Sequence, residues 1–488
     1  MYFLGYDIGT SSVKLSVISA TDGQQVLSVT YPEQEQLIDS PQAGWAEQSP
    51  EMWWDSLTAA TKIAGKKIDL KAVNGIGITY QMHGLVLVNK QQQVLRPSII
   101  WCDSRAVEIG NTAFENIGAE KCLIHCLNSP GNFTASKLKW VMENEPAVYE
   151  QVHKMMLPGD YIAMKLSGEI TTTPTGLSEG ILWDFKSNDV AEIVLEQYGI
   201  SASLIPDIVP TFGEQVRVNS TMAEELGLRE GVPVCYRSGD QPNNALSLNV
   251  MKPGDIAATA GTSGVVYGVS DQLKYDPKSR VNTFAHVNHS ESARRLGVLL
   301  CINGTGILNN WMRQNVAKDL SYPEMNELAS SVAIGAEGLS ILPFGNGAER
   351  VLENANPGAS IHGLDFNRHG KGQLLRAAQE GIVFSFYYGM EVMQEIGIDP
   401  KVIRAGKANM FLSPIFRDTL AGVSGAPIEL YATDGSRGAA MGAAYGHGHF
   451  ASFDEAFAST EKLGLIEPNT AMSAQYQEAY QRWKALLK

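Results

Sequence analysis

Apolar residues alternate with turn residues at the start of the chain. Apolar runs at 2–8 and 13–18 flank a short Gly-Thr-Ser turn, and Asp22-Gly23 supplies a second hairpin turn. Because short turns of this kind join neighbouring strands, we predict two or three antiparallel strands before residue 31. The same frame returns later, where runs at 255–260 and 265–269 flank another Gly-Thr-Ser turn.

Strand and helix patterns alternate through the rest of the chain. Ser, Pro and Glu at 49–51 favour a helix start, because Ser caps, Pro suits the first helical position and Glu suits the positive helix end. Apolar spacing predicts a helix over 374–393, the Gly/Ala-rich segment 438–446 predicts a tightly packed helix, and 167–180 is expected to be looser. Short strands are predicted at 73–78, 85–88 and 232–236. This alternation is typical of an α/β fold.

The Gly-Thr-Ser turn is repeated. Residues 9–13 recur almost unchanged at 261–265, about half of the 488-residue chain later. One copy is typical of an ordinary hairpin turn. Two copies in matching frames indicate duplicated domains, which we place at 1–246 and 247–488, and suggest two tips that hold a phosphate chain through backbone amides and hydroxyls.

Composition limits the classes of partner and the cellular compartment that we expect. The net charge is −14 and basic residues are not clustered, which argues against nucleic acid and against anionic membranes as partners. No apolar run reaches the roughly 18 residues of a membrane span. The first residues are expected to form a strand and not a signal peptide. The five scattered cysteines fit a reducing compartment, so we expect a cytoplasmic protein.

Acidic residues at strand ends are the main candidates for chemistry, because P-loop, dinucleotide-binding and protein-kinase motifs are absent. Asp7 precedes the first turn, where a carboxylate beside phosphate-binding amides is favourable only with a cation between them. It is a candidate for holding Mg²⁺, through water, against the alternative of a turn-capping Asp. Asp240 could accept a proton from an attacking hydroxyl or could cap a helix, and spacing alone leaves both open.

Two predicted loops carry further candidate binding residues. Met82 and His83 lie between predicted strands, and a lone His is more often structural. Trp101, Asp103 and Arg105 could form a salt-bridged turn.

Taken together, these motifs resemble the FGGY carbohydrate kinases, most closely their xylulokinase branch. The matching segments are spread over most of the chain, at 7–14, 44–54, 81–84, 101–105, 239–240, 261–264 and 438–444. Each segment alone is weak evidence for the resemblance, but the order and spacing of the segments together are specific.

The resemblance implies the actin-like ATPase fold, an α/β fold with two ribonuclease-H-like domains flanking a catalytic cleft. It also implies ATP and Mg²⁺ as cofactors, a small sugar as substrate and a possible homodimer. Asp240 is then the catalytic base and Asp7 supports Mg²⁺. The implied sugar contacts are Met82, His83, Trp101, Asp103 and Gln241, and the implied nucleotide contacts are Thr10, Ser11, Lys14, Gly261, Thr262, Ala405, Gly406 and Asn409.

The chain departs from the usual family pattern in four places. Gln241 stands where xylulokinases have Asn, and 404–407 reads Arg-Ala-Gly-Lys where Gly-Gly-Gly-Ala is usual. The segment 347–351 is also altered, and no acidic residue is found over 172–178, where the family carries one. Since one polar contact can change sugar discrimination greatly, these departures bear on the substrate.

The expected reaction is phosphorylation of a ketopentose, first D-xylulose, on its 5-hydroxyl by ATP. The alternatives are a kinase for another sugar or polyol, such as L-ribulose, L-xylulose or glycerol, an actin-like ATPase acting as a chaperone or filament, and a catalytically silent sugar sensor.

Overall fold

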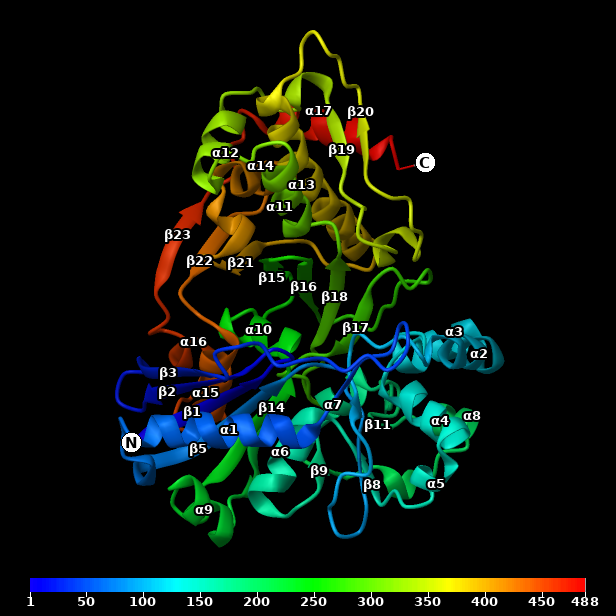
Figure 1. Ribbon diagram of the computed structural model, residues 1–488, viewed down its shortest axis with the longest axis vertical. Helices are drawn as coiled ribbons and strands as arrows, with labels where there is room; N and C mark the ends of the chain where they lie inside the picture. The colour runs from blue at the N-terminus through cyan, green and yellow to red at the C-terminus, as the bar shows by residue number, and fades with distance from the viewer. Residues whose placement is uncertain (488) are drawn as a thin grey trace. The chain divides into compact units, whose positions relative to one another are not determined.

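The computed structural model describes residues 1–487, which form two compact α/β units (Figure 1). Unit 1 comprises residues 1–251, 284–296 and 433–460, and unit 2 comprises 252–283, 297–432 and the chain from 461 onward. The predicted domains, 1–246 and 247–488, follow the linear sequence, whereas the compact units are discontinuous. The units differ from a linear division because segments from the second half pack on the first.

Unit 1 is built on a six-stranded mixed sheet. Its strand order is β13 (Phe212–Arg217), β14 (Pro233–Gly239), β5 (Val73–Tyr80), β1 (Tyr2–Ile8), β2 (Val13–Ser19) and β3 (Gln25–Tyr31). The first three strands in the chain form the predicted antiparallel meander. Strands β1, β5 and β14 are parallel, so their carboxyl ends meet at one edge of the sheet.

Helices α1 (Pro50–Gly65) and α15 (Gly435–Gly446) pack on this sheet, and both were expected from the sequence. The others are α2 (Val107–Ile117), α3 (Ala119–Cys126), α4 (Thr134–Asn144), α5 (Pro146–Tyr149), α6 (Pro158–Ser167), α7 (Pro174–Glu179), α8 (Glu192–Tyr198), α9 (Ser220–Leu226), α10 (Asp240–Ser247) and α16 (Phe453–Ala456). Short strands are β4 (Glu47–Gln48), β6 (Val86–Val88), β7 (Ser98–Ile99), β8 (Lys154–Met156), β9 (Thr171–Thr172), β10 (Trp183–Asp184), β11 (Asp189–Val190) and β12 (Asp207–Ile208).

Helix α15 lies against the first strands of the chain, as Figure 1 shows by the orange helix among the blue strands. The approach is close because two strand residues are glycines. A Cβ on Gly5 would lie 2.0 Å from the Ser436 carbonyl oxygen, and one on Gly77 would lie 2.0 Å from the Ala439 carbonyl oxygen. Ser16 and Ser436 also share a buried hydroxyl hydrogen bond of 2.7 Å across 420 residues of sequence.

The expectation of a loose segment over 167–180 was wrong for most of that range. Strand β9 and helix α7 occupy it. The Thr173 side chain accepts a hydrogen bond from the Gly176 amide, and Pro174 takes the first helical position. Both residues are standard signals for a helix start.

Unit 2 repeats this architecture. Its sheet order is β17 (Asn282–Ala285), β18 (Leu296–Ile302), β16 (Gly264–Ser270), β15 (Asp255–Ala260), β21 (Val402–Gly406), β22 (Ile428–Tyr431) and β23 (Lys462–Ile466). Strands β15 and β16 form an antiparallel hairpin, β21 and β22 continue parallel to β15, and β23 closes antiparallel. Strands β15, β16, β21, β22 and β23 correspond, in that order, to β1, β2, β5, β14 and β13 of unit 1. The repeated Gly-Thr-Ser turn therefore marks a duplicated topology.

The core of unit 2 surrounds α13 (Lys371–Glu395), which contains the predicted helix. Its other helices are α11 (Gly306–Asn315), α12 (Tyr322–Ser330), α14 (Pro414–Ser424) and α17 (Ser473–Lys484), and β19 (Ser340–Leu342) pairs with β20 (Ser360–His362). No helix within residues 1–487 has both the length and the apolar character needed to cross a bilayer.

Candidate functional site

The two candidate carboxylates of unit 1 lie at the carboxyl ends of neighbouring parallel strands. Ile8, Tyr80 and Gly239 are paired in register at the ends of β1, β5 and β14. Asp7 stands just before this level on β1, and Asp240 opens helix α10 directly after it. In open α/β sheets this edge is where ligands bind.

Asp7 and Asp240 are partly buried, and the charge of Asp7 acts on Asp240. Burial raises the pKa of Asp7 to about 6, with Lys14 opposing and Asp434 adding to the rise. Burial and the nearby Asp7 carboxylate raise the pKa of Asp240 to about 7, against hydrogen bonds from Gln241. Like charges in a partly desolvated site disfavour ionisation, and such sites are frequently functional.

The oxygen donors at this edge fit a magnesium ion. Mg²⁺ prefers oxygen ligands and retains several waters, so one or two carboxylates suffice. Among residues 1–487, no group of three or more His, Cys, Asp or Glu side chains is arranged to hold a metal. Burial is the main cause of the raised pKa of Asp7, and a cation beside this carboxylate would favour its ionised form, so Asp7 is the residue that would hold Mg²⁺.

Glu179 is the residue that sequence reasoning missed. It ends helix α7 and lies beside Met82, since a Cβ on Gly239 would be 2.5 Å from both the Glu179 Oε2 and the Met82 Cγ. Burial, followed by the charge of Asp240, raises the pKa of the Glu179 carboxyl well above its usual range. Glu179 lies one position beyond the range 172–178, at the end of a helix that the Thr-Pro signal could have predicted.

His83 lies in the same group of side chains. Its Nδ1 is 2.9 Å from the Glu179 carbonyl oxygen, and its ring packs edge-on against Phe133 with centroids 4.7 Å apart. The ring also lies 5.5 Å from that of Phe284, while Met82 is only 4% exposed. Aromatic walls around a few polar groups are typical of small-molecule binding sites.

Thr10 and Trp101, predicted for different ligands, are hydrogen-bonded to each other. The Trp101 Nε1 donates to the Thr10 hydroxyl at 3.0 Å, and that hydroxyl donates to the Gln81 amide oxygen at 3.3 Å. Gln48 connects to both, since its amide donates to the Thr10 carbonyl oxygen at 2.8 Å and accepts from Gln81 at 3.1 Å. Trp101 is 54% exposed, which leaves its ring face available to a ligand.

Asp103 is fully engaged within the protein. Its carboxylate accepts from the Ala46 amide at 2.6 Å and pairs with the Arg105 guanidinium at 2.7 Å. The Arg105 guanidinium stacks over the Trp45 ring at 3.8 Å. These contacts form the salt-bridged turn that was left open, and they account for the burial of Asp103 without a ligand. Its predicted contact with sugar stays a prediction.

The remaining predicted residues of unit 1 surround this edge. Ser11 and Lys14 are exposed. In the backbone register of the hairpin, Lys14 on β2 stands opposite Asp7 on β1. Gln241 follows Asp240 in α10, and its side chain and backbone both hydrogen-bond the Asp240 carboxyl. The role of Gln241 visible here is to orient the candidate base.

The second Gly-Thr-Ser tip borders a cavity of about 570 Å³ in unit 2. Helix α11 begins against this tip, where the Gly306 amide donates to the Gly261 carbonyl at 2.9 Å and the Ile307 amide to Thr262 at 3.1 Å. The described residues that line it are uncharged: Ala260, Gly261, Thr262, Gly306, Ile307, Asn309, Asn310, Tyr322, Asn326, Asn409, Met410, Leu412 and Ser413. Amide and hydroxyl groups in an apolar hollow suit a nucleoside.

Three of the predicted nucleotide contacts, Gly261, Thr262 and Asn409, line this cavity, whereas Ala405 and Gly406 do not. Ala405 is fully buried in β21, so only its backbone could meet a ligand. The unusual Arg404 is held by Asp255 at 3.3 Å and Glu429 at 2.9 Å. That ion-paired position explains how the chain accommodates a charged residue at the altered loop.

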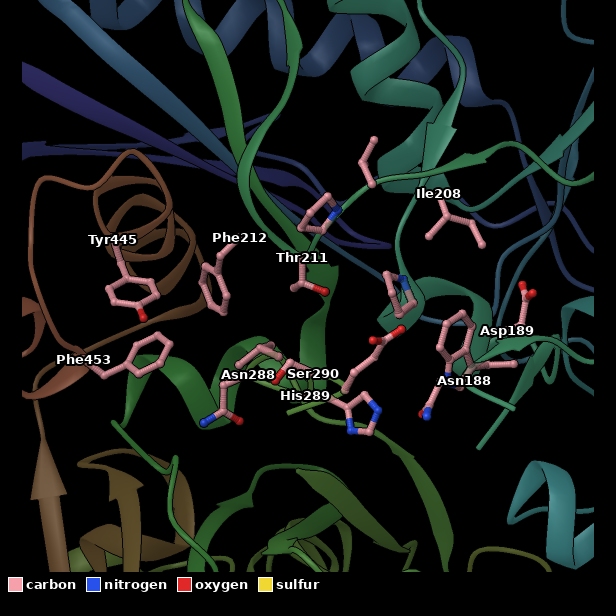
Figure 2. A pocket seen from close by; sticks show the side chains of 16 residues that line it. Asn188, Asp189, Ile208, Thr211, Phe212, Asn288, His289, Ser290, Tyr445 and Phe453 are labelled. Carbon is pink, nitrogen blue, oxygen red and sulfur yellow. The ribbon is translucent and has the colours of Figure 1, made fainter. Parts of the chain in front are cut away.

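A larger cavity of about 780 Å³ lies elsewhere in unit 1 (Figure 2). Figure 2 shows Phe212, Tyr445 and Phe453 together on one side, with Asn188 and Asp189 on the opposite side. None of the predicted site residues lines it. The strand edge with its carboxylates, and not this cavity, is therefore the candidate site for chemistry.

A duplicated α/β unit, with carboxylates at the strand ends of one copy and a nucleoside-sized cavity at the hairpin tip of the other, defines the actin-like ATPase class of fold. The N-terminal domain model of the FGGY family of carbohydrate kinases matches residues 2–247, and the C-terminal domain model matches 256–447. The chain therefore belongs to the FGGY family of carbohydrate kinases, as the sequence motifs indicated.

Individual relatives agree with this assignment. A xylulose kinase from Klebsiella pneumoniae is 30% identical, with 96% of this chain and 92% of the relative covered. The structure of a xylulose kinase from Rhodospirillum rubrum has a TM-score of 0.89 and 26% identity, covering 100% and 98% of the two chains. A Plasmodium falciparum glycerol kinase structure with ADP also reaches 0.89, at 17% identity and 100% and 97% coverage. The fold alone therefore does not select the sugar.

Proposed function

We propose that this carbohydrate kinase transfers the γ-phosphoryl group of ATP to the 5-hydroxyl of D-xylulose, with Asp240 as the general base. The observation that carries the proposal is the meeting of Asp7, Met82, His83 and Asp240 at one edge of the unit 1 sheet. The xylulose kinases among the similar proteins support the choice of sugar.

Asp240 is suited to the role of base. Its pKa of about 7 lies near neutral pH, where a general base combines an available ionised form with useful basicity. Gln241 orients the carboxyl, and the start of helix α10 fixes its backbone. Proton removal from the sugar hydroxyl lets its oxygen attack the γ-phosphorus in line.

The nucleotide is assigned to the unit 2 cavity, with Gly261, Thr262 and Asn409 as direct contacts. For unit 1, we assign the phosphate contacts to Thr10, Ser11 and Lys14 on the first hairpin, through hydroxyl and ammonium groups. When bound near Asp7, Mg²⁺ would neutralise charge on the transferred group. Positioning and electrostatic stabilisation supply most of the catalysis in phosphoryl transfer.

The base assignment is tested by Asp240→Asn. The variant is expected to bind D-xylulose with parental affinity while its kcat falls about 10²-fold to 10⁴-fold. Asp22→Asn, at an exposed hairpin turn, is the matched control. Parental turnover by Asp240→Asn, within a few-fold, would exclude Asp240 as the base.

Gln241 favours a second candidate, a kinase for another sugar or polyol such as L-ribulose, L-xylulose or glycerol. An ADP-release assay against ketopentoses, polyols and hexonates, with a no-sugar control, separates the two by their kcat/KM ratios. ADP release that no sugar changes would instead indicate a plain ATPase, and sugar binding without any ADP release would indicate a sensor.

A further inference from the structure

The large cavity of unit 1 (Figure 2) has no role in the proposed function. Its volume of about 780 Å³ lies within the range of about 300–1,000 Å³ that is typical of small-molecule sites. Every residue that lines it belongs to unit 1, and these residues come from separate stretches of the sequence. The fold of unit 1 alone therefore forms this cavity, and the chemistry of its lining indicates what it can bind.

One wall of the cavity is aromatic. Tyr445 and Phe453 stack with their ring centroids 4.0 Å apart, and Phe212 meets these two rings at 5.2 Å and 5.4 Å. Phe212 also stacks on Tyr236 at 5.0 Å, which holds its ring in place. The faces of aromatic rings carry partial negative charge, so they attract C–H groups as well as contributing apolar area.

The side of the cavity facing this wall is polar and acidic. Figure 2 shows Asn188 and Asp189 opposite the aromatic side chains, and Glu291 supplies a second carboxylate to the lining. Burial lowers the pKa of the His289 ring, and the charge of Arg294 adds to this, so the ring is neutral at pH 7. No lysine or arginine is among the described residues that line the cavity. Because like charges face each other at a cost, this lining disfavours ATP and sugar phosphates.

Two side chains of the lining have polar atoms without partners. Trp183 is 6% exposed, and its Nε1, which can only donate, has no hydrogen-bond partner within residues 1–487. The Asn288 amide nitrogen donates to the Met251 carbonyl at 3.2 Å, while its Oδ1 is a buried acceptor that lacks a partner in the same part of the chain. Unpaired buried polar atoms are costly, so a ligand that accepts from Trp183 and donates to Asn288 is favoured.

Hydroxyl groups meet this mixed requirement. A hydroxyl both donates and accepts, whereas an ammonium group only donates and an ionised phosphate only accepts. The carboxylates of Asp189 and Glu291 are further acceptors, so a ligand with several hydroxyls can satisfy them as well. A sugar ring combines such hydroxyls with a face of C–H groups that suits the aromatic wall.

We propose that the unit 1 cavity is a second ligand site, which binds an uncharged carbohydrate, either a free sugar or the sugar part of a glycoside. This site is distinct from the strand edge that carries Asp7 and Asp240. The inference goes beyond the proposed function and does not depend on it.

The binding test uses tryptophan side chains as reporters of the two sites. The chain has eight tryptophans, and in ¹⁵N-tryptophan-labelled protein the indole resonances lost in Trp183→Phe and Trp101→Phe identify the reporter of the cavity and that of the candidate sugar site. Titration with D-xylose, a free sugar, or xylobiose, a glycoside, is expected to shift the Trp183 resonance in a saturable way. Glucose 6-phosphate, an anionic sugar, should leave that resonance unchanged. The tighter binder of the two uncharged probes assigns the form of carbohydrate that the cavity prefers.

Two variants test whether the probes bind in the cavity. Phe453→Leu removes a ring of the aromatic wall, and Asn288→Leu removes the unpaired acceptor. Each should raise the midpoint of the Trp183 titration about 10-fold, the effect of losing one favourable contact. Phe366→Leu in unit 2, where the side chain is 91% exposed, is the matched control and should keep the parental midpoint. An unchanged Trp101 resonance in the variants without ligand confirms that they are folded.

Three results would overturn the second site. They are the absence of a saturable Trp183 shift below about 10 mM of either uncharged probe, an equal shift with glucose 6-phosphate, and a parental midpoint in both cavity variants. A shift of Trp101 alone has the same meaning as the first of these, because it assigns all binding to the candidate sugar site.

Failure of this inference differs from failure of the proposed function. A protein that phosphorylates no sugar, but whose Trp183 resonance responds to D-xylose or xylobiose, would refute the proposed function and retain the second site. An active sugar kinase whose Trp183 resonance ignores both probes would refute the second site and leave the proposed function intact.

Discussion

Gly239→Ala should disturb the proposed sugar site by a single methyl group. Gly239 has φ −58° and ψ 160°, which alanine adopts without strain, so the effect is steric. The added Cβ would lie 2.5 Å from the Glu179 Oε2 and 2.5 Å from the Met82 Cγ. Ordinary contacts of this kind are 3.4–4 Å, so each neighbour must move by about 1 Å.

The expected consequence is a large loss of catalytic efficiency with the sugar, at modest cost in stability. A displacement of about 1 Å can cost about 10²-fold in rate, so kcat/KM for the sugar should fall about 10-fold to 100-fold. Overpacking should lower the free energy of unfolding by about 1–3 kcal/mol.

Steady-state kinetics with each substrate varied, and urea unfolding, measure the two effects of Gly239→Ala. Gly464→Ala on β23 is the matched control, because its Cβ would make only ordinary contacts, the nearest at 3.7 Å. A Gly239→Ala enzyme with sugar kinetics within twofold of the parent would refute the steric argument.

Three further changes probe other parts of the chain. Burial lowers the pKa of Lys137 to about 7 from 10.5, so the unfolded chain binds more protons between these values and stability rises with pH. Relative to Lys137→Met, the parent should gain up to about 1.4 kcal/mol per pH unit from pH 7 to 10 in urea unfolding; a constant difference would contradict this. Gly77→Ala, which drives a methyl into the Ala439 carbonyl, should cost about 3 kcal/mol or more, and an unchanged melting temperature would refute this packing. Asn409→Gly, which suits the φ of 53°, should raise the ATP KM about 10-fold, by enzyme assay, and leave the sugar KM unchanged.

Local patterns predicted much of the fold. The β1–β2 and β15–β16 hairpins, the start of α1 and the body of α13 follow from turn chemistry, capping and apolar spacing, which act over a few residues. The membership of α15 in unit 1 could not be predicted in this way. It depends on contacts such as Gly5 with Ser436, and no local pattern encodes a partner that is hundreds of residues away.

The residues of the candidate site also fall into those that local sequence patterns could predict and those that depend on tertiary contacts. Asp7 and Asp240 could be found because strand ends of an α/β fold face ligands, and the motifs drew attention to Met82 and His83. Glu179 was missed because a charged residue in sequence is expected at the surface, and its burial is a tertiary fact. The Asp103 carboxylate pairs with Arg105 and accepts from the Ala46 amide, and its contact with sugar stays a prediction.

The late position of α15 in the chain has a consequence for biosynthesis. The ribosome makes β1, β5 and β14 long before α15, at residues 435–446, emerges. The face of the sheet that α15 covers therefore stays exposed during most of translation. A nascent or truncated chain that stops before residue 433 exposes the small-residue grooves at Gly5 and Gly77 together with their apolar neighbours. Completion of the first half of this kinase is therefore a late event, and a prematurely terminated chain becomes a client for chaperones and proteases.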